Sequence, residues 1–285
     1  MDRISVKANA KINLGLDIVG TRDDGYHLLK TVMQSVSLYD IITLEKSDEI
    51  SVICSDETLP CDEHNLAFKA AKLFFEETKL SGGVKISIKK NIPSQAGLGG
   101  GSADAAGTIF ALDKLYNTDL SNEKLCEIGE KVGSDVPFCI IGGTKLCEGV
   151  GEKLTSLKPI KDCKIVIAKG ADGISTIEAY KTYDKLQGIK HPDVDTLINA
   201  INNGEKFSHL CGNVLELTAF LATVDEIKET MVELGAENSV MTGSGSAVFG
   251  IFDNERLAEK CCDSLKKSGF FATVSVPSEQ GIEII

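Results

Sequence analysis

The sequence lacks the features that mark membrane, secreted and nucleic-acid-binding proteins. No apolar run approaches the ~18 residues of a membrane span, and Asp2, Arg3 and Lys7 interrupt the start of the chain, where a signal peptide requires an apolar stretch. Positive charge is scarce: 30 Lys and Arg stand against 42 Asp and Glu, a net charge of −12 that repels a nucleic-acid backbone. These absences predict a cytoplasmic protein with no membrane or nucleic-acid partner and no obligate protein partner.

Paired cysteines and metal-ligand spacings are also missing. The nine cysteines include no CxxC pair, and we expect reduced thiols that serve mostly as small core residues, not a disulfide framework or a zinc site. His64, His191 and His209 show no ligand spacing and are interpreted as structural.

The 285 residues suffice for one or two cores, and their apolar periodicity alternates between strand and helix spacing, as in a mixed α/β protein. Between Ile12 and Ile18 every second residue is apolar, which predicts a strand with Lys11 and Asn13 on one face. We expect a domain boundary near residues 157–162, which divides the chain into one domain of residues 1–157 and a second of residues 158–285. Further strands are predicted over residues 36–44 (broken near 39–40), 84–88, 164–168, 246–252 and 271–276, and helices over 66–74, 105–115, 121–133 and 255–267.

A glycine-rich segment, Pro93-Ser94-Gln95-Ala96-Gly97-Leu98-Gly99-Gly100-Gly101-Ser102-Ala103, lies between a predicted strand and a helix expected to begin near Ser102. Glycine permits positive φ and lets bare amides approach an oxyanion, and a helix N-terminus adds its own free N–H groups. The segment matches neither the GxxxxGK[ST] loop nor the dinucleotide fingerprint. It predicts a phosphate cradle; a flexible turn with Ser102 as a helix cap is the alternative.

Phosphoryl transfer needs charge neutralisation and help in moving the acceptor's proton, which a lysine and an aspartate can supply. Lys11 projects from a strand face, where a lysine also snorkels or forms an ion pair. Asn13 on the same face could orient a ligand or hold Lys11. Asp135 precedes Val136 and Pro137 on a short turn, where a capping role is the alternative.

Two further segments offer ligand contacts. Tyr26 and His27 follow a turn and present a π-face beside a hydrogen-bonding ring, which suits a nucleobase, although such pairs also serve as surface or packing residues. Residues 241–250 form a small-residue turn before a strand, which predicts either a phosphate contact or a tight hairpin.

Taken together, the glycine segment, Ala10 to Leu16 and Gly20 to Leu28 resemble the GHMP kinase superfamily over nearly the whole chain. The resemblance implies an α+β fold of two domains, an N-terminal domain like ribosomal protein S5 domain 2 and a ferredoxin-like C-terminal domain, with ATP and the acceptor in the cleft between them. It further implies ATP-dependent phosphorylation of the tertiary 2-hydroxyl of a cytidine-diphosphate-linked methylerythritol in non-mevalonate isoprenoid synthesis, with Mg²⁺ accompanying the nucleotide.

The resemblance also implies roles for individual residues. Lys11 and Asp135 match the catalytic pair, and Asp135 also faces the substrate. Asn13, Tyr26, His27 and Tyr180 match substrate-binding positions, and Gly243 to Ala247 match a third motif beside the site. The implied nucleotide-binding residues are Asn65, Pro93, Ser94, Gln95, Ala96, Gly97, Leu98, Gly99, Gly100, Gly101, Ser102 and Ala103.

Ala103 stands where a second serine is common, which leaves the metal ligands unassigned. Three alternative functions remain. The first is another GHMP kinase, which acts on mevalonate, homoserine or a sugar; the second is a nucleotide-binding regulatory module without catalysis; and the third is a dehydrogenase. The Tyr26 and His27 pair argues against the first, the presence of both Lys11 and Asp135 against the second, and the glycine spacing against the third.

Overall fold

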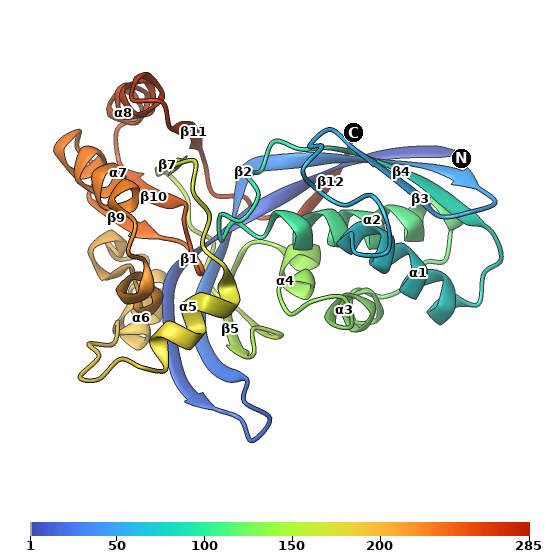
Figure 1. The fold of residues 1–285 in the computed structure, drawn as a ribbon, viewed down its shortest axis with the longest axis horizontal. Helices are drawn as coiled ribbons and strands as arrows, with labels where there is room; N and C mark the ends of the chain where they lie inside the picture. Colours follow the sequence, from blue (N-terminus) through green and yellow to red (C-terminus); the bar gives the residue numbers. More distant parts are fainter. Residues whose placement is uncertain (1) are drawn as a thin grey trace.

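Two long antiparallel strands, β1 (Arg3–Thr21) and β2 (His27–Ser47), extend from one half of the molecule into the other (Figure 1). The computed structural model describes residues 2–285. Strand β12 pairs with β1, and β4 with β2, so that the first sheet has the order β12-β1-β2-β4-β3, with β5 and β6 attached beyond β2 and β8 beside β1. The remaining strands of this sheet are β3 (Ser51–Cys54), β4 (Gly83–Lys89), β5 (Thr144–Gly149), β6 (Lys153–Ser156), β8 (Gly212–Asn213) and β12 (Ile282–Ile284).

Helices α1 (Leu66–Thr78), α2 (Gly100–Tyr116), α3 (Asn122–Glu130) and α4 (Val136–Ile141) pack together on one side of the first sheet (Figure 1). Their apolar faces and the inner face of the sheet form the larger core, which contains Phe74, Ile109 and Phe138. Helix α2 is buried almost throughout because small residues let it lie close to β1 and β2. A Cβ at Gly107 would stand 3.0 Å from Ile42 Cγ1 and 3.1 Å from Ala8 Cβ.

The second half of the chain forms a four-stranded sheet of order β11-β7-β10-β9. Helix α8 buries Ala258, Cys261, Cys262 and Leu265, a spacing of three and four residues that places them on one face. The elements of this half are β7 (Lys164–Lys169), α5 (Thr176–Tyr183), α6 (Val194–Asn203), α7 (Ala222–Glu233), β9 (Asn238–Met241), β10 (Val248–Phe252), α8 (Glu255–Lys267) and β11 (Phe271–Ser275), with 3-10 turns at 208–210 and 214–218.

Most predicted elements are confirmed, and three details are wrong. Residues 36–44 are not interrupted, because β2 is continuous and the irregularity near Tyr39 is a register shift against Asn9 and Ala10 of β1. Helix α2 begins at Gly100 within the glycine run, not near Ser102, and its N-cap is Gly99. The strand predicted from residue 246 begins at Val248.

The mixed α and β content and the two-part architecture agree with the expected fold. We propose the division at residues 157 and 158, in the link between β6 and β7; after β11 the chain returns to the first sheet as β12. All nine cysteines are free, and all except Cys61 are buried or partly buried. None of the helices formed by residues 2–285 has the length and apolarity needed to span a membrane.

Candidate active site

Lys11 lies in the middle of β1 with its side chain almost fully buried. Its Nζ donates a hydrogen bond to Asn13 Oδ1 at 2.7 Å. The Asn13 amide in turn donates to Thr31 Oγ1 at 2.9 Å, and that hydroxyl donates to the Gly15 carbonyl at 2.7 Å. The alternation of β1 thus places Lys11 and Asn13 together as predicted, and Asn13, only 1% exposed, holds the ammonium in position.

Asp135 approaches the same ammonium from α4. Its Oδ2 lies 3.5 Å from Lys11 Nζ, and its side chain is 27% exposed against 5% for that of Lys11. Asp135 occupies the N-cap position of α4 but makes no side-chain capping hydrogen bond, which removes the capping explanation for this residue. The carboxylate is therefore paired on one side and open to a ligand on the other.

The glycine-rich segment passes directly over Lys11. Gly97 and Gly99 have φ values of +72° and +70°. A Cβ at Gly97 would meet the Thr242 carbonyl oxygen at 2.0 Å, and one at Gly99 would meet Lys11 Cγ at 2.9 Å. The Leu98 carbonyl accepts a hydrogen bond from the Lys11 amide at 3.0 Å, so the segment is fixed to β1 at its centre. Only glycine fits this path, which excludes a merely flexible turn.

The segment leads into the 17-residue helix α2, whose N-cap Gly99 provides no side-chain acceptor. The first amides of such a helix have no intrahelical partners and lie at its positive dipole end, an arrangement suited to an anion. Along the segment, Ala96, Leu98 and Ala103 bury their side chains. The residues with exposed or partly exposed positions are Pro93, Ser94, Gln95, Gly97, Gly99, Gly100, Gly101 and Ser102.

A third segment, the turn between β9 and β10, completes this region. Thr242 Oγ1 accepts a hydrogen bond from the Asn13 amide at 2.9 Å, and the Ala247 amide donates to the Ala96 carbonyl at 3.1 Å. The Asn213 side-chain amide donates to the carbonyls of Met241 at 2.7 Å and Gly243 at 2.8 Å. Sequence reasoning had found this turn but missed Thr242 and Asn213. We call Lys11, Asp135, residues 93–103 and Thr242 the phosphate end of the site.

The aromatic residues gather at the other side, where the β1–β2 turn meets α5. The His27 and Tyr180 rings are stacked with centroids 4.8 Å apart and planes inclined by 25°. His27 Nε2 is 2.7 Å from Asp184 Oδ1, a partner that the sequence did not reveal. Burial raises the pKa of Tyr180 to about 12. Tyr26 is 63% exposed and lies near the Arg22 guanidinium instead of the stack. We call Tyr26, His27, Tyr180 and Asp184 the acceptor end.

Asn65 is the N-cap of α1, next to Leu66, whose Cδ1 would lie 3.2 Å from a Cβ placed at Gly101 of the glycine-rich segment. Its Oδ1 accepts a hydrogen bond from the Ala67 amide at 2.9 Å, and its Nδ2 donates to the Pro60 carbonyl at 2.7 Å. Both ends of the side chain therefore have structural partners. A nucleotide-binding role for Asn65 stays a prediction.

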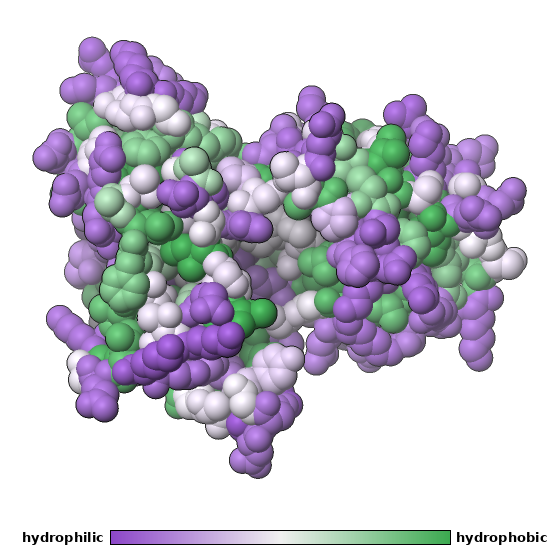
Figure 2. Space-filling model, in the orientation of Figure 1, coloured by the Kyte–Doolittle hydropathy of each residue, from purple (hydrophilic) through white to green (hydrophobic). Residues whose placement is uncertain are grey.

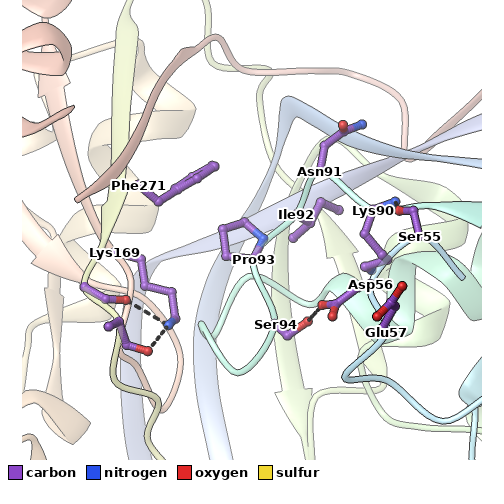
Figure 3. A pocket seen from close by; sticks show the side chains of 12 residues that line it. Ser55, Asp56, Glu57, Lys90, Asn91, Ile92, Pro93, Ser94, Lys169 and Phe271 are labelled. Carbon is purple, nitrogen blue, oxygen red and sulfur yellow. Dashed lines mark hydrogen bonds between the residues drawn. The ribbon is translucent and has the colours of Figure 1, made fainter. Parts of the chain in front are cut away.

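A cavity of about 700 Å³ opens beside the start of the glycine-rich segment. Figure 3 shows Pro93 and Ser94 on one wall, opposite Lys169 and Phe271 from the second sheet. The Lys169 ammonium donates to the carbonyls of Gly170 and Asp172, each at 3.0 Å, and burial lowers its pKa. The space-filling view in Figure 2 shows the surface hollowed between the two halves, with polar side chains around the hollow. Among residues 2–285, no three His, Cys, Asp or Glu side chains are grouped to hold a metal ion.

Two family models match the chain: GHMP kinases N terminal domain over residues 65–143 and GHMP kinases C terminal over residues 186–270. A curated protein from Clostridium beijerinckii, named 4-diphosphocytidyl-2-C-methyl-D-erythritol kinase, is 47% identical over 93% of this chain and 96% of its own length. The chain therefore belongs to the GHMP kinases, and within them to the branch whose curated members have that name. It is an ATP-dependent kinase.

Solved structures agree with this assignment. A crystal structure of 4-(cytidine 5'-diphospho)-2C-methyl-D-erythritol kinase has a TM-score of 0.79 and 31% identity, with 96% of this chain and 99% of the other covered. A homoserine kinase from Cytophaga hutchinsonii has a TM-score of 0.83 at 20% identity, covering 100% of this chain and 98% of the other. The likeness to the homoserine kinase shows only a shared fold, since the two sequences are just 20% identical.

Proposed function

We propose that this kinase transfers the γ-phosphoryl group of ATP to the 2-hydroxyl of 4-diphosphocytidyl-2-C-methyl-D-erythritol in non-mevalonate isoprenoid synthesis. The observation that carries the chemistry is the Lys11–Asp135 pair, 3.5 Å apart beneath the glycine-rich segment. The acceptor is inferred from the 47% identical relative, whose name specifies that compound. The aromatic acceptor end supplies a place for its cytosine.

At the phosphate end, the proposal assigns the triphosphate to the amides of residues 97–102 and the start of α2. Phosphoryl transfer depends mainly on positioning and charge stabilisation. Lys11 neutralises charge on the transferring group, since an ammonium has three donors and Asn13 uses one of them. Mg²⁺ is expected to arrive with the triphosphate, whose oxygens are its usual ligands, and to neutralise further negative charge.

Asp135 receives or orients the proton of the acceptor hydroxyl. Its carboxylate is the more exposed member of the pair, so an acceptor can reach it while Lys11 stays enclosed. An aspartate is a weak base for an alcohol, and holding the hydroxyl in line is the larger part of its contribution. Asn13 acts through Lys11, because its own side chain is occupied by Lys11 and Thr31.

The proposal places the cytosine against the aromatic rings of the acceptor end. His27 has its Nε2 engaged by Asp184, which leaves Nδ1 to face a base. The His27 and Tyr180 centroids, 4.8 Å apart, leave no room for a base between them. The base is therefore expected on an open face of the stack, with Tyr26 folding in from its exposed turn.

The deciding experiment is an ADP-release assay with the cytidyl substrate, mevalonate and homoserine offered separately at equal concentration. We expect turnover with the cytidyl compound alone. Preference for either of the others would contradict the proposed acceptor while leaving the kinase class intact.

A further inference from the structure

A buried cluster of charged side chains lies at the base of the glycine-rich segment and takes no part in the mechanism above. Lys90, at the end of β4, places its Nζ 2.7 Å from Asp104 Oδ2 on α2 and also contacts Asp40 Oδ2 on β2. The side chains of Asp40, Lys90 and Asp104 are 0%, 6% and 5% exposed. We call these three residues the Lys90 cluster.

The cluster joins the two ends of the segment. Asp40 Oδ1 accepts hydrogen bonds from the amides of Asn91 at 2.5 Å and Ile92 at 2.9 Å, where the chain enters the segment. Asp104 lies just after the segment, on the helix into which it leads. The Lys90 ammonium therefore connects the residues that precede the glycine-rich segment to the helix that follows it.

Gly100 allows this closure. A Cβ at that position would stand 3.1 Å from Ile92 Cγ2 and 3.3 Å from Lys90 Nζ, closer than most side-chain contacts. The start of α2 thus rests directly on the residues that precede the segment. The loop is therefore closed at its base by contacts within the chain itself.

The composition of the cluster argues against a role in stability alone. Two carboxylates share one ammonium, and Asp104 Oδ1 has no hydrogen-bond partner among the described residues. Desolvation, together with the nearby Asp40, outweighs the attraction of Lys90 and raises the pKa of Asp104 to about 8. Apolar side chains would fill this site at a lower cost in free energy.

We propose that Asp40, Lys90 and Asp104 are positioning residues for the phosphate end, which hold the two ends of the glycine-rich segment so that its amides converge before ATP binds. The inference rests on the proposed nucleotide role of that segment. A competing explanation is direct contact, because Lys90 also lines the neighbouring cavity (Figure 3). A substitution of Asp40 distinguishes the two explanations, because Asp40 is fully buried and its side chain is not open to a ligand.

The test measures MgADP affinity by calorimetry, without acceptor, for Asp40→Asn and Lys90→Met. Asparagine keeps an oxygen for the two amides but removes the charge that holds Lys90. We expect both variants to bind MgADP about 10- to 100-fold more weakly, the cost of displaced binding groups. KM for the cytidyl substrate should change less than about twofold, and hydrogen exchange at residues 94–99 should accelerate.

Asp104→Asn keeps an oxygen for the Lys90 ammonium, so we expect it to weaken MgADP binding, but by less than Asp40→Asn does. Leu125→Ala, a core truncation in α3, controls for general loss of stability and should leave MgADP affinity unchanged. If Lys90→Met does not fold, Lys90→Gln combined with Asp40→Asn removes the ammonium together with the buried carboxylate that it compensates, and should still show the weaker binding.

Weak MgADP binding by Lys90→Met with normal binding by Asp40→Asn would overturn the proposal in favour of direct contact. An equal loss in Leu125→Ala would overturn it in favour of general destabilisation. A wrong acceptor in the ADP-release assay would refute the proposed substrate without altering this MgADP series.

Discussion

The phosphate end and the acceptor end of the site are built in different ways. At the phosphate end, backbone hydrogen bonds, two glycines with positive φ and the buried Lys11 side chain fix β1, the glycine-rich segment and the β9–β10 turn to one another. At the acceptor end, His27 at the start of β2 contacts the eight-residue helix α5 and its C-cap through a stack on Tyr180, an edge-on contact with Tyr183 and the Asp184 carboxylate. The first region is fixed largely by backbone contacts, whereas the second is held by side chains.

This difference agrees with the comparisons. A homoserine kinase shares the whole fold at 20% identity, and a triphosphate cradle made from backbone amides does not depend on which acceptor is used. Specificity requires side chains that touch the acceptor. Under the proposed function, we therefore expect the acceptor specificity of this chain to depend on the side chains of the acceptor end.

Asp135→Asn removes the carboxylate that pairs with Lys11 at the phosphate end, and it should have the largest effect. We expect kcat to fall by about 10²- to 10⁴-fold, the range for a positioned proton acceptor, with KM for ATP nearly unchanged. Steady-state kinetics with the cytidyl substrate measure this. Asp184→Asn, which lies outside the Lys11 pair, should retain most of kcat, and normal turnover in Asp135→Asn would remove the assigned role.

Gly97→Ala tests whether the phosphate end is as rigid as its contacts indicate. The new Cβ would lie 2.0 Å from the Thr242 carbonyl oxygen at a φ of +72°, so we expect at least about 10-fold weaker MgADP binding and a lower free energy of unfolding. Gly269→Ala is the matched control, because its φ is +88° and nothing lies within 4 Å. Equal effects in both variants would mean that backbone strain, not the contact with Thr242, is responsible.

Tyr180→Leu tests the acceptor end. Loss of a stacking ring is worth about 1–3 kcal/mol per base, so KM for the cytidyl substrate should rise about 5- to 150-fold while KM for ATP stays constant. Tyr180→Phe keeps the ring and should keep KM. A shift in KM for ATP as well would indicate that the two ends are not independent.

The pH dependence of stability should report on the Lys90 cluster, at the base of the glycine-rich segment. Because the pKa of Asp104 is about 8 in the folded protein and about 4 in an unfolded chain, the folded state holds this proton more tightly between these values. Stability is therefore present below about pH 4 and is lost as the pH rises through about 8, with a slope of at most about 1.4 kcal/mol per pH unit. Urea midpoints should fall from pH 5 to pH 8.

Asp104→Asn should flatten this slope between pH 5 and pH 8. Lys90 and Asp40 contact the carboxyl, and the thiols of Cys54 and Cys139 interact with it electrostatically. Those groups remain in the variant, so a slope that persists in Asp104→Asn would assign the titration to one of them.

The sequence predicted several of the longer elements but less of the contacts between elements. Alternation in β1 correctly put Lys11 and Asn13 on one face, and the helix predicted over residues 255–267 is α8. The start of α2 was misplaced because glycine is a poor helix former, whereas in the structure Gly100 begins the helix in close contact with Ile92 and Lys90.

At the acceptor end, the adjacent residues Tyr26 and His27 were expected to act together. The structure separates them, because Tyr26 belongs to the exposed turn and His27 begins β2. Asp184 was missed because nothing local distinguishes an aspartate at the end of a short helix. The role of Asp184 depends on its contact with His27, which is 157 positions away in the sequence.

By itself, the sequence indicated a backbone segment suited to phosphate, because glycine spacing and a helix start act locally on φ and on free amides. Only the tertiary structure decided that Asp135 meets Lys11, that Thr242 reaches a strand 229 positions away, and that Lys90 closes the loop between Asp40 and Asp104. Periodicity tells which face of an element is buried. It does not tell what that face meets, since partners are chosen by packing across the whole chain.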